Sequence, residues 1–246
     1  MPQRSTEDAL YALVSYTRRA IECKKLVTLV SLDIEGAFDN AWWPRIRQRL
    51  AEENCPVNLR RVIDSYLTDR RVRLRYGEVE ITKCPEKGCV QGSIGGPILW
   101  NLLLDPLLNT LREAGTRVQA FADDIVLMFD AYEAIDIERN ANEALEIVRK
   151  WGELNKLKFA PKKTNAILLT RKQNYDTPKL KMAGENIKMS KEVKILGLIH
   201  DQTRFIETHL LTRESDFSIQ EKRRKLRKTR KAHGTCSVKA RFPPHV

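Results

Sequence analysis

The most informative stretch of the sequence is RVQAFADDIVLMF, residues 117–129. Two short runs of apolar, aromatic and β-branched residues flank a pair of adjacent carboxylates, Asp123 and Asp124. This pattern predicts a tight β-hairpin whose turn carries both aspartates. Neighbouring like charges repel each other, and a bound divalent cation relieves that repulsion. Taken alone, the motif is better explained by a solvated hairpin turn that favours Asp.

A second carboxylate lies at the end of another apolar segment, LVTLVSLDIE (26–35). The β-branched and apolar run predicts a buried strand that leads into Asp33. An ionised carboxylate near a core is costly unless it is paired or bound to a metal. Because carboxylates from two neighbouring strands can hold Mg²⁺, Asp33 and the hairpin aspartates are candidates for one metal site.

The rest of the chain alternates helical and extended patterns. Apolar residues at helical spacing predict helices over about 5–24, 44–53, 57–67, 96–115 and 133–156. Strands are predicted at 72–76, 79–82 and near 165–169, 179–182 and 193–199. This order predicts an α+β fold in which helices stack on an antiparallel sheet.

The positive charge is concentrated at one end of the chain. The protein has 246 residues and a formal net charge of +12, and ten basic residues but no Asp or Glu lie within Lys222–Val246. Residues 1–221 therefore carry a net charge of only +2. The basic segment has few apolar residues and no sustained periodicity, which predicts disorder or weak helix. Phosphate binding, a nuclear address and a solvated or non-native end all remain open for it.

Several classes of protein do not fit this sequence. Its longest apolar stretches are shorter than the roughly 18 residues of a membrane span. Five cysteines without a CxxC pair argue against a disulfide framework or a zinc knuckle. We therefore expect a reducing location in the nucleus or cytoplasm. The four histidines have no metal-binding spacing.

Five motifs occur in a fixed order along the chain. They are SLDIEGAFDN (31–40), GCVQGSIGGPILWNLLLD (88–105), AFADDIVLMF (120–129), KFAPKKTNAILL (158–169) and VKILGL (193–198). Together they resemble the reverse transcriptase of non-LTR, LINE-type retrotransposons of arthropods. RSTEDAL (4–10) and FDNAWWP (38–44) are characteristic of that group, and the resemblance covers roughly residues 4–205.

The resemblance implies an RNA-directed DNA polymerase. Its partners would be an RNA template, a DNA primer and a dNTP, and its cofactor would be Mg²⁺, with Mn²⁺ as the alternative ion. No membrane partner is implied, and the oligomeric state stays open. A catalytically inactive remnant that binds nucleic acid through its basic tail is the alternative function.

The implied architecture is a polymerase palm, a ferredoxin-like antiparallel sheet with helices packed on one face. Residues 1–205 would form a partial reverse transcriptase palm domain, and 206–246 a divergent basic tail. Fingers and thumb would be largely missing, so we expect a fragment of a larger polyprotein.

The resemblance also implies a catalytic centre. Asp33, Asp123 and Asp124 would be the catalytic carboxylates, with Asp33 and Asp123 as the main metal ligands and the backbone carbonyl of Ile34 completing the site. Phe38 would be the steric gate that stacks under the deoxyribose and excludes a 2′-hydroxyl. By itself, Phe38 is better explained as a core aromatic, and only its offset of five residues from Asp33 favours a gate.

Further residues are implied around this centre. Gln91 and Gly92 would line the nascent base pair and the template, although a flexible loop before a helix also explains Gly92. Lys163 would lie near the incoming triphosphate, where a cation offsets the charge of the departing pyrophosphate. Ile195, Leu196 and Gly197 would form the primer grip.

Overall fold

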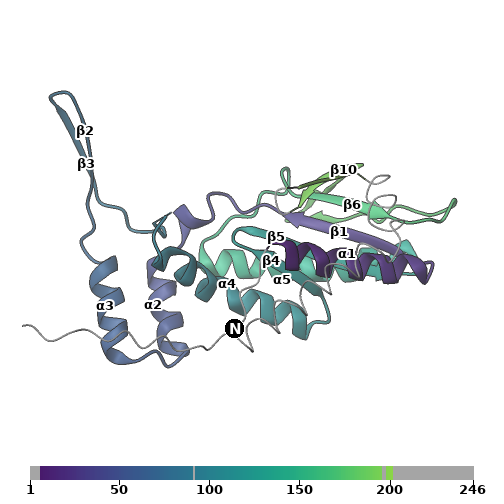
Figure 1. Ribbon diagram of the computed structural model, residues 1–246, viewed down its shortest axis with the longest axis horizontal. Coiled ribbons are helices and arrows are strands. Elements are labelled where there is room, and N and C mark those ends of the chain that lie inside the picture. Colours follow the sequence, from purple (N-terminus) through teal and green to yellow (C-terminus); the bar gives the residue numbers. More distant parts are fainter. Residues whose placement is uncertain (1–5, 91, 196–197, 202–246) are drawn as a thin grey trace, which may run out of the picture. The chain divides into compact units, whose positions relative to one another are not determined.

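The computed structural model describes residues 6–90, 92–195 and 198–201 (Figure 1). All of them belong to a unit that spans Met1–Thr203, and the second unit, Arg204–Val246, lies outside the described residues. The predictions for the basic tail therefore concern residues outside the described ranges. None of the described helices is long and apolar enough to cross a membrane.

The helices agree with the sequence prediction to within two residues at each end. They are α1 (Thr6–Glu22), η1 (Phe38–Asn40, a 3₁₀ helix), α2 (Trp43–Glu52), α3 (Val57–Leu67), α4 (Gly95–Glu113) and α5 (Ala134–Asn155). Only the short η1 was not predicted. Pro44 occupies the first turn of α2, where its missing N–H costs no hydrogen bond.

A five-stranded sheet with the order β4-β5-β1-β6-β9 forms the centre of the described unit. Its strands are β1 (Leu26–Leu32), β4 (Arg117–Phe121), β5 (Asp124–Ala131), β6 (Asn165–Leu169) and β9 (Lys188–Met189). The pairs β4–β5, β5–β1 and β1–β6 are antiparallel, and only the short β6–β9 pair is parallel. The predicted antiparallel sheet is thus confirmed, with β1 at its centre.

Helices cover both faces of this sheet, so the expectation of helices on one face is wrong. Val30 and Leu127 pair across the strands and belong to a core cluster that also contains residues of α4 and α5. On the opposite face, Asp130 of β5 accepts a hydrogen bond from Tyr16 of α1. The physical reason lies in β1, which is apolar on both faces and needs cover on each.

The remaining strands form small two-stranded sheets. They are β2 (Val72–Tyr76) with β3 (Val79–Lys83), β7 (Lys181–Met182) with β8 (Glu185–Asn186), and β10 (Glu192–Ile195) with β11 (Leu198–Asp201). The β2–β3 hairpin extends from the segment that follows α3, as Figure 1 shows, and its residues are exposed. Gly77 makes its turn at φ +59°, a conformation that glycine adopts at little cost.

Candidate active site

Two strands bring distant carboxylates to one end of the sheet. Leu32, the last residue of β1, pairs with Ile125 of β5. Asp33 follows Leu32 and Asp124 precedes Ile125, so each aspartate is next to the last residue pair of the β1–β5 ladder. Residues about 90 positions apart in the sequence thereby lie at the same end of the sheet.

The hairpin turn differs by one residue from the sequence prediction. Phe121 pairs with Asp124, so the turn residues are Ala122 and Asp123, and Asp124 already belongs to β5. Ala122 has φ +54°, which is the left-handed conformation that L-residues other than Gly, Asn and Asp rarely adopt. The indole Nε1–H of Trp100 donates a 2.9 Å hydrogen bond to the carbonyl of Ala122. A tertiary contact from α4 therefore supports the turn.

The backbone of Asp33 is held from the other side of β1. Its carbonyl accepts a 2.9 Å hydrogen bond from the N–H of Ala160, and its N–H donates to Oγ1 of the buried Thr164 at 3.4 Å. Ile34 forms a single β-bridge with Phe159. The exposed Lys163 lies in the turn between Ala160 and Thr164, at the same end of the sheet as Asp33.

Phe38 is fixed by two contacts. It is half-buried, and its ring centroid lies 5.2 Å from that of Trp100 at an interplanar angle of 32°. Its carbonyl accepts a 2.7 Å hydrogen bond from the N–H of Cys89. Burial raises the pKa of the Cys89 thiol to about 11, so this residue acts as a packing group and not as a nucleophile. Phe38 is therefore positioned by α4 and by the loop that precedes it.

The loop before α4 lies against η1. Gly88 has φ +104°, and a Cβ atom there would stand 3.0 Å from the carbonyl oxygen of Asp39. Its N–H donates to the carbonyl of Ala41 at 2.8 Å. Gly92 is exposed and has φ +79°, and Gln91 lies outside the described residues. The predicted roles of Gln91 and Gly92 stay predictions.

The primer-grip motif is only partly described. Ile195 is the last residue of β10 and is 1% exposed. Leu196 and Gly197 lie outside the described residues. Their predicted role stays a prediction.

The carboxylates suit a hard divalent ion but do not form a complete cage. Among the described residues, no three His, Cys, Asp or Glu side chains are gathered so as to hold a metal together. Asp33 is half-buried, whereas Asp123 and Asp124 are exposed. Mg²⁺ commonly takes one or two carboxylates and completes its shell with water and substrate phosphates. Oxygen donors from two strand ends fit that chemistry without a third protein ligand.

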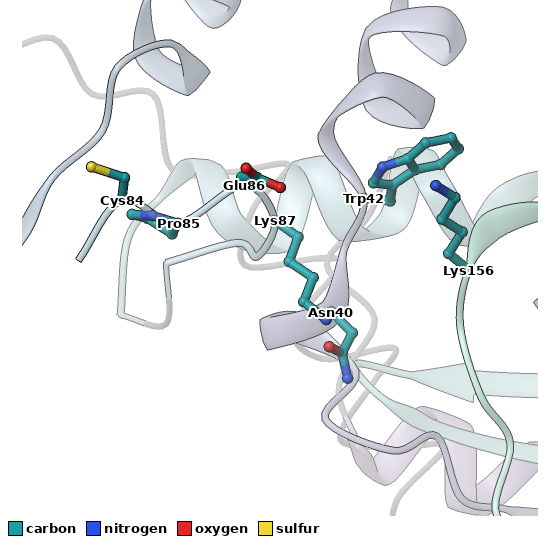
Figure 2. Close-up of a pocket in the computed structure, with 7 residues that line it drawn as sticks. All are labelled: Asn40, Trp42, Cys84, Pro85, Glu86, Lys87 and Lys156. Carbon is teal, nitrogen blue, oxygen red and sulfur yellow. The ribbon is translucent and has the colours of Figure 1, made fainter.

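A cavity of about 580 Å³ lies elsewhere, next to the start of α2 (Figure 2). It is lined by Asn40, Trp42, Cys84, Pro85, Glu86, Lys87 and Lys156, and none of the predicted site residues lines it. Figure 2 shows Lys156 beside Trp42, with Nζ 3.9 Å from the ring centroid. Trp43 is buried, as expected of a helix-packing residue, whereas Trp42 is only half-buried.

Two residues that support the site escaped the sequence prediction. Trp100 and Thr164 both lie within recognised motifs, but neither carries a charge or a metal-binding group. Their roles arise from contacts with Ala122 and Asp33, which are separated from them by 22 and 131 positions. Only the polar atom on an otherwise apolar buried residue signals such a role, because a buried indole N–H needs an acceptor.

Comparison with known proteins identifies a family and several relatives of this chain. The family described as reverse transcriptase (RNA-dependent DNA polymerase) matches residues 1–200. A Pol polyprotein from the type-1 retrotransposable element R1 of Bradysia coprophila is 30% identical over 198 residues, which is 79% of this chain and 19% of that protein. The probable RNA-directed DNA polymerase from transposon BS of Drosophila melanogaster is 26% identical over 213 residues, 84% of this chain and 23% of that protein.

A solved structure shows a similar fold. Apo telomerase from Candida tropicalis, truncated from its C-terminal domain, superposes with a TM-score of 0.51 at 15% identity, covering 81% of this chain and 40% of that one. At this identity the likeness concerns the fold alone. The chain spans about a fifth of the length of the curated relatives named above.

Proposed function

This chain belongs to the reverse transcriptase family, and from that premise we propose that it forms the palm of a non-LTR retrotransposon polymerase. The reaction is transfer of a nucleotide from a dNTP to the 3′-hydroxyl of a DNA primer on an RNA template. The sheet β4-β5-β1-β6 is the palm in this proposal. Fingers and thumb are left to other parts of a longer polyprotein, since the relatives are several times longer than this chain.

One observation carries the proposal. In the register of β1 against β5, Asp33 follows the last residue pair of the ladder and Asp124 precedes it, next to the turn residue Asp123. Like-charged carboxylates near one end of a sheet repel each other, and a bound divalent cation relieves that repulsion. Such an arrangement favours binding of a divalent cation, which also coordinates the phosphates of the dNTP.

Asp33 and Asp123 are the proposed main metal ligands, with Asp124 beside them and the carbonyl of Ile34 completing the set. The residues fit Mg²⁺ or Mn²⁺, both of which prefer oxygen donors. The bound ions would supply activation of the primer hydroxyl and neutralisation of charge on the leaving pyrophosphate. The protein contributes by fixing both strand ends through backbone hydrogen bonds before substrate arrives.

The neighbouring residues would orient the substrates. Phe38, packed on Trp100, would contact the sugar and exclude a 2′-hydroxyl. Gln91 and Gly92 would contact the nascent base pair. Lys163, in the turn beside Asp33, would approach the triphosphate. Ile195 to Gly197 would hold the primer end.

Primer extension on an RNA template, with dNTPs and either Mg²⁺ or Mn²⁺, tests the proposal. Asp33→Asn and Asp123→Asn are expected to lower the rate by about two to three orders of magnitude, since each removes metal-binding charge while keeping the side-chain shape. Asp136→Asn, at a half-buried position in the first turn of α5 where the carboxylate pairs with Arg139, is the control and should retain the rate. Equal rates in all three variants would refute the assignment.

A further inference from the structure

We propose that Trp100 is a positioning residue for Asp123, acting by holding the hairpin turn through the carbonyl of Ala122. The functional meaning of this contact rests on the proposed function, because the role of Asp123 as a metal-binding carboxylate comes from there. The contact itself stands on the geometry of α4 and of the β4–β5 hairpin.

The hydrogen bond joins a buried donor to the backbone of the hairpin turn, directly before Asp123. Trp100 is 0% exposed, and its Nε1–H donates to the carbonyl oxygen of Ala122 over 2.9 Å. An indole offers one donor and no acceptor, so this bond uses its whole polar capacity. The next residue along the chain is Asp123, so the peptide that Trp100 holds is the one that leads directly into the carboxylate.

The backbone at Ala122 explains why the turn needs such support. Its φ of +54° lies in the left-handed region, where tight hairpin turns usually place Asn, Asp or Gly. Alanine gains no local hydrogen bond from its side chain there, and its Cβ makes the conformation unfavourable. The surrounding structure must therefore hold it, and Trp100 supplies the bond that does so.

The same indole also touches the second functional element. Phe38 packs against Trp100 at a centroid distance of 5.2 Å. One buried side chain thus links the residue proposed to select the sugar to the turn that carries Asp123. A shift of Trp100 would therefore affect both.

The test is amide hydrogen exchange in the peptide over 118–126, measured on the metal-free full chain. Trp100→Phe keeps the aromatic contact and removes the donor. Exchange is expected to become about fivefold faster, the factor that corresponds to one ordinary hydrogen bond. Trp43→Phe is the matched control, because Trp43 is also buried and donates its Nε1–H to a backbone carbonyl, that of Gly88, at 2.8 Å. It should leave this peptide unchanged.

A rescue variant separates positioning from packing. In the Trp100→Phe background, Ala122→Gly should recover part of the lost protection, since glycine adopts a positive φ without the cost that alanine carries. A purely structural role of Trp100 would not respond to a residue in the turn. Double and single variants that exchange at the same rate would overturn the proposal.

A further measurement on the native chain needs no substitution. Trp151 is also buried, but its Nε1 has no hydrogen-bond partner in the described part of the chain. The indole proton of Trp100 should therefore resonate further downfield and exchange more slowly than that of Trp151.

The outcomes decide two questions separately. Unchanged exchange in Trp100→Phe, an equal effect of Trp43→Phe, or indole protons that behave alike would each overturn the positioning role. Because exchange needs no metal, template or dNTP, a protein in which Asp123→Asn leaves primer extension unaffected would defeat the proposed function without touching this result.

Discussion

Asp130 lies on the same strand as Asp124, but near the opposite end of it. Asp124 is exposed at the start of β5, near the turn. Asp130, near its other end, accepts hydrogen bonds from Tyr16 and from Lys25, the latter at 2.7 Å. Burial alone would raise the pKa of Asp130, but these two donors outweigh burial and lower it. Asp130 thus attaches α1 to the sheet, a structural role that sequence pattern did not indicate.

Replacing Asp130 by Asn is expected to lower the free energy of unfolding at pH 7 by about 1–2 kcal/mol, the range for a charge-assisted hydrogen bond on a partly exposed group. Because the folded-state pKa is depressed, this contribution is complete above the unfolded pKa of about 4. It declines as the pH falls from there through the folded pKa.

Thermal unfolding between pH 7 and pH 2 measures this effect. The difference between wild type and Asp130→Asn should be constant above about pH 5 and should shrink in more acidic buffer. Asp176→Asn, at an exposed position, serves as the control and should show neither effect. A difference that persists unchanged down to pH 2 would mean that the ion pair contributes nothing.

Among the elements, the helices and the main strands were predictable because each carries its own apolar period. α3, for example, begins and ends where the pattern predicted. β1 ends at Leu32 and not at residue 35, since beyond it the chain pairs only through isolated contacts such as Ile34 with Phe159. Local pattern gives no information on where a partner strand stops.

The features that escaped prediction depend on partners distant in sequence. The sequence predicted a turn at Asp123 and Asp124, because local propensity favours aspartate in turns, whereas the structure has the turn one residue earlier, at Ala122 and Asp123. Trp100 shifts that balance by a hydrogen bond that no local pattern records. Helices cover both faces of the sheet because β1 is apolar on both faces and lies at its centre. The central position of β1 depends on strands distant in the sequence, so the local pattern does not reveal it. The roles of the aspartates themselves came from family resemblance.

Adjacent glycines at the start of α4 should respond in opposite ways to the same substitution. A Cβ at Gly95 would meet nothing within 4 Å, whereas one at Gly96 would stand 2.6 Å from the carbonyl oxygen of Val90. Gly95→Ala is therefore expected to leave stability unchanged or raise it by up to about 1 kcal/mol. Gly96→Ala should lower it by about 1–3 kcal/mol, because the clash involves backbone.

Urea denaturation of both variants against wild type measures the two changes. Each variant serves as the control for the other, since composition and helix propensity change identically. Equal midpoints would show that the segment before α4 moves away at no cost, and that its close approach to Gly96 does not position the loop.

For the whole molecule, the excess positive charge is concentrated in the last 25 residues of the sequence. The net charge of residues 1–221 is +2, and ten of the twelve excess positive charges lie in Lys222–Val246. The nearly neutral residues 1–221 offer little general attraction for phosphates. Sequence-independent affinity for RNA should therefore come mostly from the basic end.

Deleting residues 222–246 is expected to weaken binding to single-stranded RNA and to flatten its dependence on salt. Each phosphate contact that is lost should reduce the slope of log K against log salt by about 0.7. Fluorescence anisotropy over a range of salt concentrations measures the slope for both chains. As the control for chain length, a full-length variant has the ten basic residues replaced by Gln. Identical slopes for the wild type, the deletion and this variant would contradict the expectation.

The central position of β1 has a consequence for folding during synthesis on the ribosome. β1 is complete at Leu32, but its partners begin at Asp124 and Asn165. At ordinary elongation rates, roughly 7 to 27 s pass between the synthesis of Leu32 and that of Asn165. Both edges of this apolar strand are unpaired until β5 has been made, and one edge stays unpaired until β6 follows, a state that favours aggregation or chaperone binding. The central strand of the folded sheet is thus a segment at which the nascent chain is prone to aggregate.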